Sequence, residues 1–350
     1  MTAVQTNGHR WPKSRIHLIR GGKVYDVTNF ADRHPGGRQV LEQHNGLDVE
    51  TAMRDAASHT HSKAAYSILE KYFVGTVDSF LQTGSYRDVP DTITRLDNYY
   101  KNDIVDWSKP MLGQVELLGD KYFDWTHEQV DRPIRLFESD FAEMMTKAYW
   151  WFVPITWLPV VLASLWISFK ALSDTQEVWP QHSLGFQLGQ TSIPCLFALG
   201  VFFWTFLEYV IHRWLFHLRP PSNSPFLIRL HFSLHGQHHK SPMDSMRLVF
   251  PPLPASVFAV LFFFGCKALF PSGAAFAVFA GIVSGYIAYD LIHYYLHHGG
   301  QPPVAYFQRL KTYHAHHHYE YQQLGFGISS KMWDYPFGTL IPDDDDVRKH

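Results

Sequence analysis

Ten histidines in the second half of the chain stand at spacings that suit metal binding. Residues four apart lie on one face of a helix, so His293 and His297 can reach the same ion. Two further groups have the spacing HX2HH: His235, His238 and His239, and His314, His317 and His318. In each of them the first and third histidines also share a helix face, whereas the second points about 100° away from the third and can reach a second ion. The pattern favours two ions over one. The predicted metal ligands are His212, His217, His235, His238, His239, His293, His297, His314, His317 and His318.

The first two of these histidines have a different spacing. His212 and His217 are five residues apart, and an α-helix would separate their directions by about 140°. We expect them to straddle a helix end or to serve different ions. Ten imidazoles also exceed the four ligands of a tetrahedral zinc site.

Several residues near these groups are predicted to support the site without binding metal. His231, His298 and His316 are expected in supporting or surface positions. Glu208 and Asp290 precede His212 and His293 by four and three residues. Each carboxylate either accepts a hydrogen bond from a ligand imidazole or makes an interhelical bond unrelated to metal.

A separate histidine motif lies near the N-terminus. In His34-Pro35-Gly36-Gly37 a fixed proline and two glycines let the backbone turn tightly beside a flat ligand, as an axial haem ligand requires. A second axial ligand must come from another segment, and His59 and His61 are the candidates. Two axial imidazoles leave no position for oxygen, so such a haem would carry electrons.

Long uncharged runs show which elements must position these residues. A bilayer core of about 30 Å requires about 20 helical residues, and the sequence predicts four such spans at about 148–169, 191–211, 250–270 and 273–293. The ten histidines fall at or beyond span ends. The chain has 18% charged residues, a net charge of -2 and two cysteines, which argues against a nucleic-acid partner and against a disulfide-stapled scaffold.

The predicted fold is an α-helical integral membrane domain with four transmembrane helices, a cytosolic histidine-rich cap and an N-terminal small α+β haem domain. We divide the chain into a haem domain at 12–85, a linker and membrane-proximal segment at 86–140, and a membrane domain at 141–342. The first segment has no secretory signal, so we expect the N-terminus to stay in the cytosol. Counting four crossings then places the histidines on the same side of the membrane as the N-terminus. The basic residues indicate that this side is cytosolic: Arg132, Arg135, Lys147, Arg213, Arg219, Arg229, Lys240, Arg247, Arg309, Lys311 and Lys331.

Residues 15 to 80 resemble the cytochrome b5 family. The resemblance rests on the strand-like Gly22–Val27, the His-Pro-Gly-Gly motif, and a second histidine followed by serine. In that family the second ligand precedes a helix and a closing Val-Gly pair. His61, followed by Val74-Gly75, fits this spacing better than His59, so the resemblance implies haem b held by His34 and His61.

Along the chain the histidine groups follow the order HX4H, HX2HH, HX3H and HX2HH. This order resembles that of the membrane fatty acid hydroxylase superfamily, whose members use histidine-bound diiron to oxidise unactivated C–H bonds. Further segments narrow the resemblance to the fatty acid 2-hydroxylase family: Asp106–Pro110, Arg132–Phe137, Pro242–Asp244, Arg247–Pro252 and Gly325–Ser330. It implies that the ten histidines bind two iron ions. Because affinity alone favours zinc over ferrous iron, zinc is possible in purified protein.

The resemblance implies a multi-pass enzyme of the endoplasmic reticulum membrane. It would hydroxylate carbon 2 of long-chain fatty acids or ceramide N-acyl chains for 2-hydroxy sphingolipid synthesis. Its partners would be dioxygen, the lipid bilayer and an NAD(P)H-dependent cytochrome reductase, whose electrons pass through the fused haem domain.

Three alternatives remain at this point. A cytochrome b5-fused desaturase is disfavoured because front-end desaturases usually open the last histidine group with glutamine, where this chain has His314. A sterol oxidase of the same superfamily is the second. A haem-regulated metal transporter is the third, and it would need polar ligands at mid-depth in the spans, whereas these histidines lie at the span ends.

Overall fold

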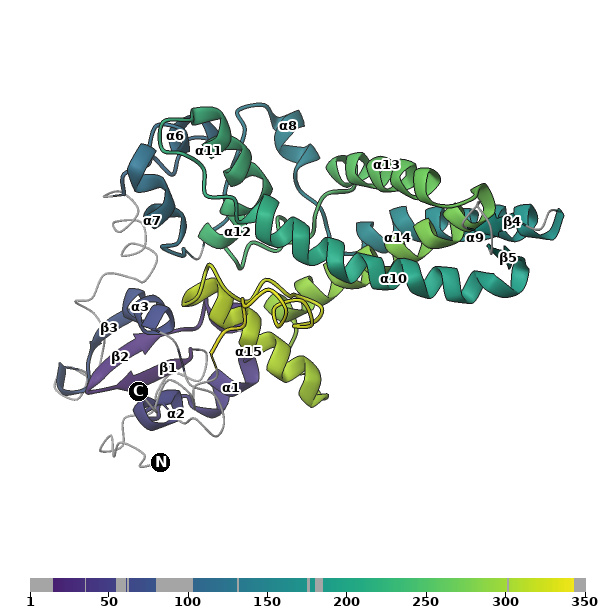
Figure 1. Ribbon diagram of the computed structural model, residues 1–350. Coiled ribbons are helices and arrows are strands. Elements are labelled where there is room, and N and C mark those ends of the chain that lie inside the picture. Colours follow the sequence, from purple (N-terminus) through teal and green to yellow (C-terminus); the bar gives the residue numbers. More distant parts are fainter. Residues whose placement is uncertain are drawn as a thin grey trace.

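The computed structural model describes residues 15–34, 36–54, 61, 63–79, 103–130, 132–174, 177–179, 185–300 and 302–342. The molecule is elongated, with long helices at one end and a small mixed domain at the other (Figure 1). The segments that carry the histidine groups lie between them. This arrangement confirms the predicted fold class in its helical membrane domain, its histidine-rich cap and its small N-terminal α+β domain.

The N-terminal domain is built on a three-stranded antiparallel sheet in the order β1-β2-β3. Gly21 and Gly22 have positive φ angles of 54° and 77° and form the two-residue turn between the first two strands. Tyr25 and Tyr72 are buried in the core beneath three short helices. The elements are β1 (His17–Arg20), β2 (Lys23–Asp26), α1 (Arg38–Gln43), α2 (Glu50–Arg54), α3 (Lys63–Lys71) and β3 (Phe73–Thr76).

Among the described residues, four helical segments are long and apolar enough to cross a bilayer: Phe152–Ser173, Gln190–Phe216, Pro252–Leu269 and Ser272–His298. The four predicted spans are therefore confirmed, with shifted ends. The first begins at Phe152, and the Ala148 N–H before it donates to the Met246 carbonyl, 2.9 Å away. The corresponding helices are α9 (Phe152–Asp174), α10 (Ile193–Val210), α13 (Pro252–Leu269) and α14 (Ser272–His298).

Helix α14 is the central helix of the bundle and packs against both α10 and α9. Its backbone meets that of α10 at Gly281 and Gly200, where an added Cβ would lie 2.1 Å from the Phe197 carbonyl oxygen and 2.0 Å from the Val278 carbonyl oxygen. Small residues allow this close approach in membrane helices. The crossing fixes α10 against α14, the helices that lead to His212 and to His293.

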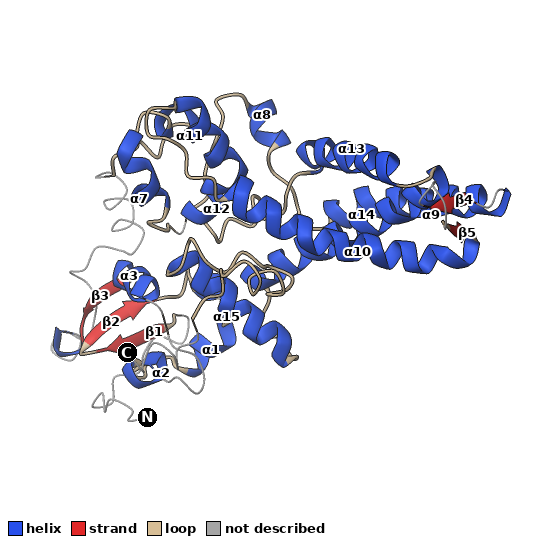
Figure 2. Cartoon of the chain, viewed as in Figure 1, coloured by secondary structure: helices blue, strands red, loops and turns tan. Residues whose placement is uncertain are grey.

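A short hairpin that the sequence analysis did not predict closes the opposite end of the bundle. Strands β4 (Glu177–Trp179) and β5 (Phe186–Leu188) pair antiparallel there (Figure 2). The Glu177 carboxylate accepts hydrogen bonds from the N–H groups of Gly273 and Ala274 at 2.8 and 3.0 Å. The carboxylate thus provides acceptors for two unpaired N–H groups in the first turn of α14, and its negative charge interacts favourably with the positive end of the helix dipole.

The cap combines short helices from three parts of the chain. Apolar side chains of the described residues in the predicted linker and membrane-proximal segment pack on Ile228 and Phe232. Buried Arg247 donates to the Glu143 carboxylate and to the Ile134 carbonyl, which joins two of these parts. The elements are α6 (Leu112–Val115), η2 (Gly119–Lys121), α7 (Tyr122–Thr126), α8 (Asp140–Met145), η4 (Ile211–Phe216), α11 (Pro225–His231), η5 (Phe232–Gly236), α12 (Gln237–Lys240) and α15 (Ala305–Tyr319).

Candidate metal centre

The structure brings all ten predicted ligands together in two groups of five buried imidazoles. Within each group, one ring nitrogen from every member lies within 4.8 Å of the others. Group A consists of His212, His217, His235, His239 and His317. Group B consists of His238, His293, His297, His314 and His318. The groups adjoin, since the rings of His239 and His318 stack with centroids 4.3 Å apart.

Helical periodicity accounts for most of this division. His235 and His239 lie in group A, whereas His238 turns toward group B. In α15, His314 and His318 lie in group B, whereas His317 turns toward group A. Each HX2HH group thus supplies both clusters, which is the arrangement that the spacing predicts.

His212 and His217 lie together in group A, so the predicted alternative of different ions is wrong. The reason is local. Residues Ile211–Phe216 form a π-helical turn, in which the His217 N–H donates to the His212 carbonyl at 3.0 Å. A turn closed between residues five apart places both side chains on one face, which an α-helix would not do. His217 also ends the helical segment, so the two histidines do straddle a helix end.

The nitrogens that face one another fit a small cation. Nε2 of His239 lies 3.2 Å from that of His217 and 3.1 Å from that of His235. Two imidazoles bound at about 2.1 Å and at right angles to one another would bring their nitrogens to about 3.0 Å. A ring nitrogen carries at most one hydrogen, so hydrogen bonds among the rings cannot satisfy every nitrogen in a group.

Unpaired atoms support the same interpretation. Nε2 of His238, His293 and His317 is buried without a hydrogen-bond partner. Unsatisfied buried polar atoms are rare and call for an explanation. A metal ion in each group would use these lone pairs, so the residues present fit two cations.

Burial also keeps the imidazoles neutral, as metal binding requires. It lowers the pKa of His235 well below 6.5, and the neighbouring imidazoles lower it further. The same two causes act on the pKa of His318. Both groups therefore offer uncharged donors at neutral pH.

Two backbone carbonyls orient the imidazoles of group A. Nδ1 of His212 lies 2.6 Å from the Phe326 carbonyl oxygen, and Nδ1 of His317 lies 2.7 Å from that of Leu324. Because a carbonyl only accepts, Nδ1 carries the hydrogen in both rings, and the Nε2 lone pair is free for a metal. Nothing in the sequence predicted these partners, although Gly325–Ser330 carries part of the family resemblance.

A buried carboxylate holds the loop that carries these carbonyls. Asp334 accepts from the N–H groups of Phe326 and Gly327, both at 2.9 Å, and from the Thr339 hydroxyl at 2.8 Å. Burial raises the pKa of Asp334, and these donors act against the rise. Gly325 has a φ of 72°, and an added Cβ would lie 2.5 Å from Cδ1 of Ile341.

Glu208 and Asp290 do not contact the imidazoles through any described hydrogen bond. Glu208 accepts from the N–H groups of Ile328 and Ser329 at 2.9 and 2.7 Å, and Asp290 accepts from the Phe250 N–H at 3.1 Å. Neither expected role is seen among the described residues: each carboxylate binds backbone N–H groups of a loop, and not an imidazole or a second helix. Glu208 nevertheless anchors the loop that positions Phe326.

Three histidines were expected in supporting or surface positions, and all three lie outside both groups: His231, His298 and His316. His231 Nδ1 is 2.6 Å from the Tyr122 hydroxyl, and His316 faces Glu320 at 3.6 Å. The ring of His298 stacks on that of Tyr294 at 5.0 Å.

The N-terminal pair has a geometry suited to a flat ligand. The rings of His34 and His61 face each other, 16° from parallel, with centroids 6.2 Å apart. An iron between them at about 2 Å from each nitrogen, with ring centres about 1 Å further out, needs about 6 Å. A Cβ on Gly36 would lie 2.9 Å from Cε1 of His34, so glycine is required beside this ring. The other candidate, His59, lies outside the described residues.

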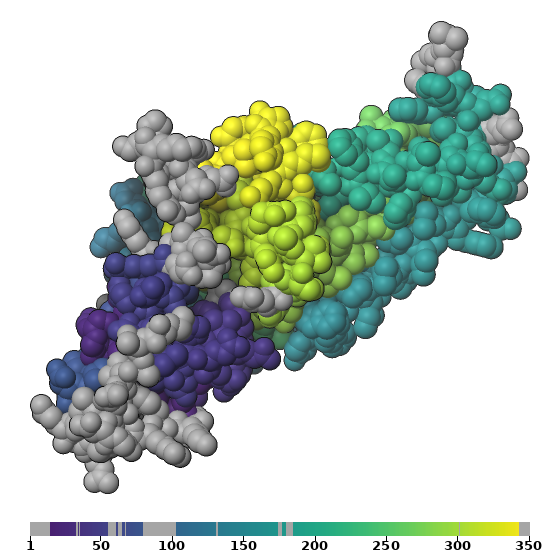
Figure 3. All heavy atoms as spheres, turned by 90° about the horizontal axis from the view of Figure 1, so that it is seen from below, coloured from purple at the N-terminus to yellow at the C-terminus, as the bar shows by residue number. Residues whose placement is uncertain are grey.

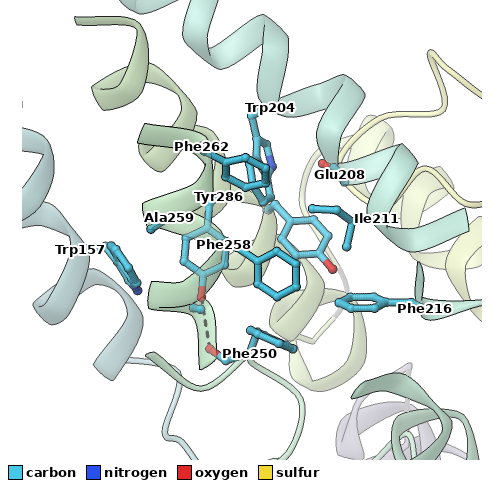
Figure 4. A pocket seen from close by; sticks show the side chains of 12 residues that line it. Trp157, Trp204, Glu208, Ile211, Phe216, Phe250, Phe258, Ala259, Phe262 and Tyr286 are labelled. Carbon is cyan, nitrogen blue, oxygen red and sulfur yellow. Dashed lines mark hydrogen bonds between the residues drawn. The ribbon is translucent and has the colours of Figure 1, made fainter. Parts of the chain in front are cut away.

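An apolar pocket lies among the helices of the bundle (Figure 4), and two of its lining side chains contact the histidine groups. Phe216 stacks on His235 of group A at 5.1 Å, and Tyr289 stacks on His293 of group B at 6.0 Å. The hydroxyl of Tyr286 donates to the Phe250 carbonyl at 3.2 Å. The lining residues are Trp157, Trp204, Glu208, Ile211, Phe216, Phe250, Ala255, Phe258, Ala259, Phe262, Tyr286 and Tyr289.

Comparisons with known proteins agree on this architecture. Residues 197–339 match the family model for fatty acid hydroxylase, and residues 4–78 match that for the cytochrome b5-like heme/steroid binding domain. The chain is 43% identical over 343 residues to a fatty acid 2-hydroxylase of Rattus norvegicus, covering 94% of this chain and 92% of that protein. It is 35% identical over 368 residues to a ceramide very long chain fatty acid hydroxylase of Saccharomyces cerevisiae, covering 93% and 90%.

A solved structure is similar as well. In that structure of full-length scs7p only the hydroxylase domain is visible. It superposes with a TM-score of 0.61 at 38% identity and covers 71% of this chain and 90% of that chain.

Proposed function

The chain belongs to the fatty acid 2-hydroxylase family, and from this premise we propose that it is a diiron monooxygenase acting on carbon 2 of long acyl chains. The observation that supports the proposal most directly is that two groups of buried, neutral imidazoles adjoin one apolar pocket through its lining residues Phe216 and Tyr289. The division of the chain at 12–85, 86–140 and 141–342 is part of this proposal.

In this proposal the ten histidines of groups A and B hold two iron ions. Bound iron supplies the redox chemistry that activates dioxygen and oxidises a C–H bond, whereas zinc has none. The carbonyls of Phe326 and Leu324 keep two of the imidazoles in the tautomer that binds metal. Asp334 and Glu208 hold the loop that presents these carbonyls.

The pocket orients the substrate. An acyl chain buried among its aromatic and alanine side chains would be dry and fixed in depth, and depth decides which carbon lies beside the metals. Phe216 and Tyr289 separate the pocket from the two groups and would set the position of the chain's polar end. Their stacking on His235 and His293 couples the substrate to both groups.

The substrate class follows from the names of the relatives. The rat protein is a fatty acid 2-hydroxylase, and the yeast protein is a ceramide very long chain fatty acid hydroxylase. We therefore propose a long-chain fatty acid or a ceramide N-acyl chain as substrate, with a role in 2-hydroxy sphingolipid synthesis. The proposed location is the endoplasmic reticulum membrane, as the resemblance to the family implies. The candidate spans support a multi-pass membrane protein, and the basic residues near the histidines support a cytosolic N-terminus and metal centre.

The N-terminal domain is the proposed electron carrier. Haem b held by His34 and His61 would have both axial positions filled, so it would transfer electrons and would not bind oxygen. An NAD(P)H-dependent cytochrome reductase would reduce it. Two electrons are required for each molecule of dioxygen used.

Mass spectrometry of lipids formed under isotopically labelled dioxygen tests this function. Membranes containing the wild-type chain are expected to give labelled hydroxyl at carbon 2. His238→Ala removes a group B imidazole and should abolish the label, while His316→Ala, outside both groups, should retain it. A desaturated product, or an unchanged label in His238→Ala, would refute the proposal.

A further inference from the structure

The N-terminal domain lies against the part of the membrane domain that carries the last histidine group. Helix α3, which follows His61, packs on α15, which contains His314, His317 and His318. The space-filling view shows the purple N-terminal domain and the yellow-green C-terminal segment side by side (Figure 3).

A chain of hydrogen bonds links the two domains at this contact. Lys71, the last residue of α3, donates from Nζ to the Gln129 carbonyl at 3.1 Å. The side chain of Gln129 donates in turn to the backbone carbonyl of His318 at 2.7 Å. The next residue, Val130, donates its N–H to the Lys240 carbonyl at 2.8 Å, directly after His239. Segment 129–130 therefore touches the backbone of α12 and α15, which supply histidines to both groups.

The haem-binding loop makes a second approach. A Cβ added to Gly37 would lie 3.9 Å from Cα of Gly300. Gly299 and Gly300 follow His298 at the end of α14, and Lys311 of α15 donates to the Gly299 carbonyl at 2.6 Å. The segments that carry His34 and His61 thus each approach an element that carries group B histidines.

We propose that the N-terminal domain docks on α15 of its own chain and passes electrons to that chain's metal centre. This inference rests on the proposed function. The reductase gives one electron at a time to the haem. Two such transfers, with two protons and one dioxygen, convert a C–H bond to C–OH and release one water. Docking within a chain replaces a bimolecular encounter with an intramolecular one, so its rate does not depend on protein concentration.

Mixing two inactive full-length variants tests the route. His34→Ala lacks a haem ligand and keeps groups A and B, while His238→Ala lacks a group B imidazole and keeps both haem ligands. Each is purified, and the two are reconstituted together in vesicles with reductase, NADH and labelled dioxygen. We expect no labelled product above that of either variant alone. Product restored by the mixture would overturn the intramolecular route.

A charge reversal at the contact gives an independent measurement. Lys71→Glu places a carboxylate against the Gln129 carbonyl, and we expect haem reoxidation to slow about tenfold. Arg54→Glu makes the same charge change at an exposed residue of α2 and should leave the rate unchanged. The haem absorption spectrum should be normal in both variants. Equal reoxidation rates in Lys71→Glu and wild type would contradict the docking.

A small soluble reductant separates the two proposals. Hydroxylation driven by that reductant should be equal in Lys71→Glu and wild type, because the metal centre is intact. A fall equal to that seen with reductase would mean that Lys71 is merely structural, which overturns the docking. If wild type makes no labelled product with either reductant, the proposed function itself fails.

Discussion

Groups A and B contain five imidazoles each, but different kinds of backbone structure hold the two groups. In group B, His293 and His297 occupy one turn of α14, and His314 and His318 occupy one turn of α15. Group A contains the π-helical pair His212 and His217, and two of its imidazoles are fixed by carbonyls of the loop after α15. Regular helices position all of group B, whereas group A combines regular helices with π-helical turns.

This difference has a consequence for the hydrogen bonds around each group. Nδ1 of His314 and His318 in group B is buried without a partner, as is Nδ1 of His239 in group A, whereas Nδ1 of His212 and His317 in group A is bonded to a carbonyl. Group B thus depends on the packing of α14 and α15, and group A depends on the loop that Asp334 holds. Changes to one support should leave the other group intact.

The largest expected effect on hydroxylation comes from removing a single imidazole, from group A in one variant and from group B in another. His217→Ala and His297→Ala should each abolish hydroxylation, a larger loss than the roughly 100-fold decrease expected for an outer partner. Each variant should bind about one iron instead of two, because the other five imidazoles remain. Metal analysis of purified protein checks this. If either variant loses both ions, the groups are not separable.

The next effect concerns the loop. Asp334→Asn replaces the carboxylate that holds Phe326 and Gly327, and we expect about 10- to 100-fold weaker metal binding at group A. Competition with a chelator measures it in two backgrounds: His297→Ala, which leaves group A intact, and His217→Ala, which leaves group B intact. Asp120→Asn, at an exposed site, is the control. Equal weakening in both backgrounds would contradict the separate supports.

A pocket substitution should affect turnover and spare both groups. Ala259→Trp fills part of the pocket, and we expect about tenfold lower turnover of long acyl chains, with shorter chains less affected. Leu261→Trp, on the exposed face of the same helix, is the matched control. Product analysis over a series of chain lengths checks this. A loss of bound metal in Ala259→Trp would show that the pocket supports the groups as well.

The smallest effect is that of acid on the metal-free protein. Burial lowers the pKa of His235 in group A and of His318 in group B, while unfolded histidines titrate near 6.5. Below that pH the unfolded chain binds protons that the folded chain does not. Stability is therefore fully present above pH 6.5 and declines as the pH falls below it. Thermal unfolding from pH 7.5 to 5.5 measures the decline, and a melting temperature that rises with acid would contradict it.

The sequence predicted group B more completely than group A for a physical reason. Spacings of three and four residues follow α-helical periodicity, so His293 and His297 are readable as a pair. His212 and His217 share a site only because of the π-helical turn, which their spacing alone does not show. The four spans are also readable, since length and hydropathy define them.

The supporting contacts were much harder to predict. Any residue can supply a carbonyl, so nothing in the sequence marks Phe326 and Leu324 as partners of imidazoles. Glu208 stands four residues before His212, yet its carboxylate reaches Ser329, which is distant in the chain. The β4–β5 hairpin is short and lacks a clear alternating pattern, and its role depends on the position of α14.

Anomalous diffraction at the iron edge, from crystals of the iron-loaded full-length protein, tests the central claim most directly. The account predicts one peak in group A and one in group B, each at about 2 Å from the facing imidazole nitrogens. A single peak shared by all ten histidines, or peaks at other places in the membrane domain, would contradict it.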